Sequence, residues 1–173
     1  MDYLFFVHGL ILLFMAAAAW ALARTVDRPN NWIWFGLFAL GHGIYTWLEM
    51  LTFGLGDNRY ILMLRLVLLA ASLIFLIEFA RRGTVHQRYS KSSIWIVLPI
   101  LIMVLVIGGD LIGWRVYVIR YLAVAAGLWA TWALWANAKG SVGGGYLKLA
   151  AASLLGYALV VIFISSSLMW RLN

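Results

Sequence analysis

The sequence predicts an all-α fold, a polytopic membrane bundle of six transmembrane helices in one domain covering 1–173. Three observations predict it. Of the 173 residues, 65% are hydrophobic and 11% are charged, whereas a soluble domain is about half apolar and about a quarter charged. Apolar runs of about 20 residues, long enough to cross a bilayer as a helix, recur along the chain. Prolines number only two, and the runs lack the ten-residue alternation of a β-barrel.

The first three expected spans cover about 3–23, 32–53 and 60–80. The first follows Met1 and Asp2 without a basic leader and is too long for the apolar core of a signal peptide, so we expect it to be retained. The ends of the spans carry tryptophan, tyrosine and arginine, which are typical of anchors at a membrane interface.

The last three expected spans cover about 94–109, 117–136 and 147–170. The connections between spans are short, and the last of them, "NAKGSVGGGY", is rich in glycine. No connection could hold a second domain. The sequence contains no cysteine, which excludes disulfides and thiolate metal sites.

The basic residues predict the orientation of the bundle. Eight lie on one side, namely Arg24, Arg28, Arg81, Arg82, Arg88, Lys91, Lys139 and Lys148, and four lie on the other, namely Arg59, Arg115, Arg120 and Arg171. The positive-inside rule places the eight in the cytoplasm, so both termini are expected outside. The net charge of +7 therefore reflects membrane topology and predicts no nucleic-acid partner.

Four ionisable groups within the spans are candidates for function, because a charge inside a bilayer costs at least a few kcal/mol. His42 lies near the middle of the second span, and Glu49 lies about 10 Å further outward by helical rise. His8 and Arg65 lie about 7 and 8 Å outward of the centres of their own spans. Three helices thus place His8, Glu49 and Arg65 in one layer of the outer leaflet.

Glu49 and Arg65 are equidistant from position 57, where the second and third spans form a hairpin. We therefore expect an ion pair or a hydrogen bond between them. One interpretation is a polar pocket open to the outside, bordered by Tyr45 and with His42 at its floor. The alternative is a polar clasp that only holds the helices in register.

Two histidines on different helices could also ligate one iron, so His8 and His42 predict a possible haem b site. A plain metal site formed by His8 and Glu49 is a further alternative. Gly41 and Gly43 flank His42, where they would let a flat ligand or a neighbouring helix approach the backbone closely.

The segments "FFVHGLILLFMAAAAWAL", "LFALGHGIYTWLEML", "LIFLIEFARRG" and "RYLAVAAGLWATWAL" resemble the multi-helix sensor region that precedes bacterial membrane-bound histidine kinases and diguanylate cyclases. Its most specific part is His42-Gly43, followed by Trp47 and Glu49. Two features depart from that family. Thr46 stands where an acidic residue is common, and a seventh helix usually returns the chain to the cytoplasm. We expect either a fragment or a stand-alone relative that signals through a partner.

The expected function is a sensory or ligand-binding module of the bacterial cytoplasmic membrane, and not an enzyme. Its expected ligand-binding residues are His8, His42, Tyr45, Glu49 and Arg65. Its expected partners are the lipid bilayer, a small-molecule ligand, and a signalling partner or a second copy reached through helix contacts. A haem protein for redox or gas sensing, a small transporter and a structural accessory subunit are the alternatives. The sequence has no nucleotide-binding glycine motif and no zinc-protease helix.

Overall fold

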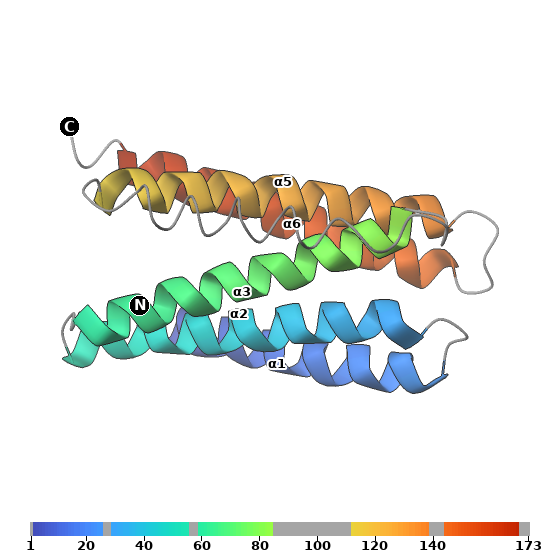
Figure 1. The fold of residues 1–173 in the computed structure, drawn as a ribbon, viewed down its shortest axis with the longest axis horizontal. Helices are drawn as coiled ribbons and strands as arrows, with labels where there is room; N and C mark the ends of the chain where they lie inside the picture. Colours follow the sequence, from blue (N-terminus) through green and yellow to red (C-terminus); the bar gives the residue numbers. More distant parts are fainter. Residues whose placement is uncertain (1, 26–28, 56–58, 85–111, 139–143, 170–173) are drawn as a thin grey trace. The chain divides into compact units, whose positions relative to one another are not determined.

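The computed structural model describes residues 2–25, 29–55, 59–84, 112–138 and 144–169, and all of them are helical. The helices are α1 (Asp2–Thr25), α2 (Pro29–Leu55), α3 (Arg59–Thr84), α5 (Ile112–Ala138) and α6 (Gly144–Met169) (Figure 1). The predicted helical fold class is confirmed for these residues. Each of the five helices contains or overlaps one expected span, and the span expected at 94–109 lies outside the described residues.

The chain divides into two compact units, residues 1–79 and 80–173. The first unit contains α1, α2 and most of α3. The second contains the last turn of α3 together with α5 and α6. Because the candidate residues of the sequence analysis all belong to the first unit, that unit alone positions the site.

Helices α1 and α2 lie side by side and run in opposite directions (Figure 1). Glycines bring them together near both ends of the contact. A methyl group added at Gly36 would lie 2.6 Å from the indole nitrogen of Trp20, so the tryptophan of α1 fills the space that the glycine of α2 leaves. The roles are reversed at the other end, where Trp47 of α2 covers Gly9 of α1. At each end of the contact a glycine of one helix is thus paired with a tryptophan of the other.

Aromatic side chains join α2 to α3. The ring of Phe35 lies 5.1 Å from that of Phe79, and the rings of Trp34 and Phe75 are 5.9 Å apart. Nearer the hairpin, a methyl group at Gly41 would lie 3.5 Å from the side chain of Ser72, which is ordinary van der Waals contact. Helix α2 is thus packed against α1 on one side and against α3 on another.

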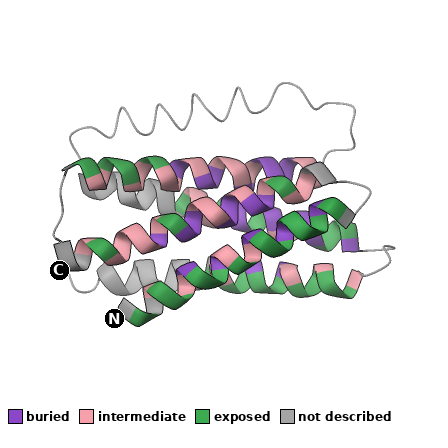
Figure 2. Ribbon diagram, turned by 90° about the horizontal axis from the view of Figure 1, so that it is seen from below, coloured by how far each residue is buried: buried purple, intermediate pink, exposed green. Residues whose placement is uncertain are grey.

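Figure 2 shows buried and exposed residues alternating along the described helices. Many of the buried residues are small and many large apolar residues are exposed, although some leucines and phenylalanines, such as Leu73 and Phe38, are buried as well. Most of the buried hydrophobic residues are alanines, whereas Phe14, Val67 and Trp132 are all at least 60% exposed. Soluble proteins bury their large apolar residues and rarely expose extended apolar patches. Interfaces between membrane helices, in contrast, are enriched in small residues that allow close approach. This distribution is the one that a lipid-facing bundle requires.

Two of the described helices are long and apolar enough to cross a membrane, over residues Phe5–Arg24 of α1 and Tyr60–Thr84 of α3. Most residues of both stretches are not buried, unlike those of a core helix in a soluble protein. Helix α2 carries three tryptophans, a histidine, a glutamate and two asparagines, which lower its hydropathy. Six membrane-spanning helices and external termini remain predictions.

Helices α5 and α6 lie side by side in the second unit, where the end of α3 also contacts α5. The Asn137 amide donates hydrogen bonds of 2.7 Å to the carbonyls of Ala133, in its own helix, and Gly83, in α3. Across the α5–α6 contact, the Lys148 ammonium lies 6.0 Å from the centre of the Trp135 ring, within cation–π distance. The amide thus ties the end of α3 to α5.

The Asn137→Ala substitution is expected to lower the free energy of unfolding by about 1 kcal/mol, because the Gly83 carbonyl loses its side-chain donor. Ser153→Ala is the control, since that hydroxyl bonds only the Leu149 carbonyl of its own exposed helix face. Thermal unfolding in detergent micelles measures both variants. Equal effects of the two substitutions would contradict a bridging role for Asn137.

Candidate ligand-binding site

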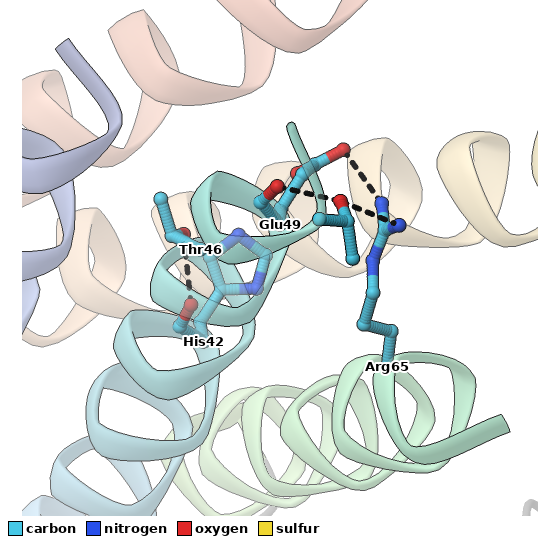
Figure 3. A network of polar contacts seen from close by, with 5 residues as sticks. His42, Thr46, Glu49 and Arg65 are labelled. Carbon is cyan, nitrogen blue, oxygen red and sulfur yellow. Dashed lines mark hydrogen bonds and ion pairs between the residues drawn. The ribbon is translucent and has the colours of Figure 1, made fainter. Parts of the chain in front are cut away.

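An ion pair joins α2 to α3 inside the first unit. Glu49 and Arg65 approach within 3.1 Å, from guanidinium Nη2 to carboxylate Oε1 (Figure 3). The predicted contact is confirmed, and its cause is the one inferred from the sequence: both residues stand the same number of residues from the α2–α3 turn. The side chains are 26% exposed for Glu49 and 16% exposed for Arg65. Both side chains of the ion pair are therefore partly exposed.

Thr52 completes the ion pair, a role that the sequence analysis missed. Its hydroxyl accepts a hydrogen bond of 3.3 Å from Nη1 of Arg65 and donates one of 2.7 Å to the main-chain carbonyl of Glu49. Figure 3 shows Arg65 reaching from α3 toward Glu49, with dashed lines marking these bonds. The spacing held a signal for this role, because a residue three positions after Glu49 lies on the same helix face.

Two more of the predicted site residues lie close to the pair, His8 of the expected outer layer and Tyr45, which was expected to border the pocket. The phenol of Tyr45 is near enough to Glu49 and Arg65 to interact electrostatically with both. His8, on α1, is half-buried and near enough to Glu49 for the two groups to interact electrostatically. The structure thus joins Glu49 to Arg65, as predicted, and places His8 and Tyr45 near them.

The predicted depth of His42 in a membrane stays a prediction, but the structure shows that its side chain is buried. Only 6% of it is exposed, and its ring lies 5.5 Å from the rings of both Phe38 and Tyr45. Its Nδ1 is 3.4 Å from the hydroxyl of Ser72 on α3, and that hydroxyl donates a 2.8 Å bond to the Leu69 carbonyl. The serine oxygen is therefore placed to accept a hydrogen bond from an Nδ1–H of the imidazole. Ser72 is a second partner that the sequence analysis missed.

The glycines beside His42 face two different helices. Gly41 meets Ser72 of α3, whereas a methyl group at Gly43 would lie 3.1 Å from the carbonyl oxygen of Gly9 on α1. The expectation that these glycines allow close helix approach is confirmed. His42 therefore stands between a close contact of α2 with α1, at Gly43, and an ordinary contact of α2 with α3, at Gly41.

Trp47 acts in packing, as expected. Its indole N–H donates a 3.2 Å hydrogen bond to the carbonyl of Phe6, and its ring stacks on that of Phe6 at 5.9 Å between centres. The same indole covers Gly9. These contacts hold α1 against α2 on both sides of His8, and so fix the level at which His8 meets Glu49.

A metal or haem site stays a prediction. Within the described residues, no group of three or more histidine, cysteine, aspartate or glutamate side chains is placed to hold a metal ion. The backbones of α1 and α2 meet at Gly9 and Gly43, each next in sequence to a histidine. A haem ligated by His8 and His42 would have to lie beside this contact or separate the two helices.

Comparison with protein-family models, curated proteins and solved structures found no match to the chain. The functional groups of the site therefore indicate what it can bind. A carboxylate and a guanidinium offset each other in charge, while a phenol, a hydroxyl and an imidazole add donors and acceptors. Such a cluster can orient a polar group by hydrogen bonds at an apolar surface.

Proposed function

We propose that this protein is a sensory module of the bacterial cytoplasmic membrane, which binds a small molecule at the Glu49–Arg65 pair. One observation carries the proposal: a partly exposed ion pair joins two helices whose surroundings are otherwise apolar. Ionisable groups in such segments are costly and are functional candidates by default. Occupancy of the site would be passed to a signalling partner or a second copy through helix contacts.

The position of α2 between α1 and α3 would allow ligand binding at Glu49 to change the packing of both neighbouring helices. Glu49 contacts α3 through Arg65, while Trp47, two residues earlier, contacts α1 through Phe6. A ligand that moves Glu49 would therefore shift α2 against both neighbours. A ligand can shift the packing of α2 only if it binds one of two helix arrangements more tightly than the other. The resemblance of α1 and α2 to bacterial sensor regions supports the same function.

A polar clasp without a ligand is the competing explanation, and mass spectrometry of purified protein separates the two. Protein extracted in a mild detergent is expected to carry a small molecule that the double variant Glu49→Gln/Arg65→Gln loses. Thr46→Val is the matched control, because the Thr46 hydroxyl bonds only the His42 carbonyl of its own helix. Equal retention by the double variant, or no bound molecule in any preparation, would favour the clasp.

The same preparation tests the haem alternative. A Soret band in its absorption spectrum that disappears in His42→Ala would identify the bound molecule as haem. A colourless preparation that still carries a small molecule supports the proposed function instead.

A further inference from the structure

We infer that the site selects a net-neutral amphipathic molecule taken from the bilayer, with a hydroxyl or carbonyl head against Glu49 and Arg65 and an apolar body along α2 and α3. The inference rests on the proposed function and names the class of ligand. Three properties of the site lead to it: its charge balance, the engagement of its guanidinium, and the apolar residues beside it.

Charge balance disfavours a charged ligand. The carboxylate of Glu49 and the guanidinium of Arg65 are 3.1 Å apart and offset each other. A ligand carboxylate bound to Arg65 would lie beside the carboxylate of Glu49, and a ligand ammonium bound to Glu49 would lie beside the guanidinium. Like charges held close together in a poorly solvated site repel each other strongly. A neutral ligand avoids both penalties.

The hydrogen bonds of the site lead to the same conclusion. Both terminal nitrogens of Arg65 are engaged, Nη2 by Glu49 and Nη1 by Thr52. A ligand carboxylate that made a two-point contact through these two nitrogens would compete with the partners already bound to them. A hydroxyl can instead donate a single hydrogen bond to the Glu49 carboxylate without disturbing the guanidinium.

The surroundings of the pair accommodate an apolar ligand body. Leu51, the neighbour of Thr52, is 47% exposed, and Leu64, the neighbour of Arg65, is 50% exposed. Met63 is 47% exposed on the same helix. Large apolar side chains are thus exposed within one helical turn of the ion pair on both helices. An alkyl or ring system laid against them would exchange contacts with lipid tails for contacts with side chains of similar polarity, so an apolar ligand body carries no penalty there.

Photolabelling with three probes of equal chain length tests the inference. The probes are 1-decanol, decanoate and decylammonium, each with a diazirine near its head group, added to the whole protein in phosphatidylcholine nanodiscs. Peptide mass spectrometry counts the labels at 44–67, with the exposed leucines of α6 (Leu149 and Leu155) as the reference for non-specific partition. The alcohol is expected to label 44–67 about tenfold more than either ion, the ratio that about 1.4 kcal/mol of binding free energy produces.

A variant that removes the charge of Glu49 tests whether the charge balance of the site causes the preference for the alcohol. In Glu49→Gln the guanidinium of Arg65 loses its counter-charge, so the preference is expected to move from the alcohol to decanoate. In Thr46→Val the alcohol preference should be unchanged. Equal or stronger labelling of the wild type by decanoate overturns the ligand class, while the labelled segment still supports a binding site. If no probe labels 44–67 above the α6 reference, the proposed function fails as well. The comparison of the three probes on the wild-type protein tests the ligand class even if a variant does not fold.

Discussion

Replacing Arg65 with methionine is expected to lower the free energy of unfolding by about 3 kcal/mol, the largest effect of any single change at the site. The substitution keeps the apolar stem but leaves the Glu49 carboxylate without its counter-charge and the Thr52 hydroxyl without its donor. Reversible unfolding in mixed micelles, followed by circular dichroism, measures the change.

The double variant Glu49→Leu/Arg65→Met is expected to recover most of that loss, because no charge is left behind in apolar surroundings. Lys148→Met is the control for the loss of one positive charge. Lys148 is exposed on α6 and its contact with the Trp135 ring is of the exposed cation–π kind, so the substitution should change stability by no more than about 1 kcal/mol. If the single and double variants were equally unstable, the cost would come from lost packing and not from an unpaired charge.

Replacing Gly9 with alanine is expected to lower the free energy of unfolding by about 2 kcal/mol, although alanine is the better helix former. The added methyl group would overlap the Trp47 indole, whose N–H is held by the Phe6 carbonyl, so α1 and α2 would have to separate. Thermal unfolding in micelles measures the loss.

Gly156→Ala is the matched control for this prediction. Gly156 also lies within a helix, but a methyl group there meets nothing within 4 Å. We expect that substitution to raise stability by up to about 1 kcal/mol, through helix propensity alone. A second variant, Gly9→Ala/Trp47→Leu, should be more stable than Gly9→Ala because it makes room for the methyl group. Similar signs at Gly9 and Gly156 would contradict the packing argument.

The predictions for Arg65 and Gly9 concern the two different contacts that α2 makes, one with α3 and one with α1. The contact with α1 depends on shape, through glycines covered by tryptophans, while the contact with α3 near the hairpin depends on charge. A ligand at Glu49 acts on the second contact directly and on the first through the rigid helix between them. A module of this kind would signal by a shift of α2 and not by local unfolding.

Much of the candidate site could be predicted because the helical rise sets depth. Counting residues from the α2–α3 turn places Glu49 and Arg65 at one level, and the structure joins them. Counting does not reveal which polar groups on neighbouring faces turn toward each other. Thr52 and Ser72 therefore escaped notice, although both hold a hydrogen bond to a predicted residue.

The sequence by itself determined the helical class of the described residues, the α2–α3 hairpin and the shared level of Glu49 and Arg65. Each follows from local quantities, namely apolar run length, turn position and rise per residue. Only the tertiary structure decided that Trp47 covers Gly9, that His42 lies against Ser72, and that the ion pair stays partly exposed. These features depend on how each helix is rotated about its axis, and that rotation is set by the side chains of its neighbours rather than by its own sequence.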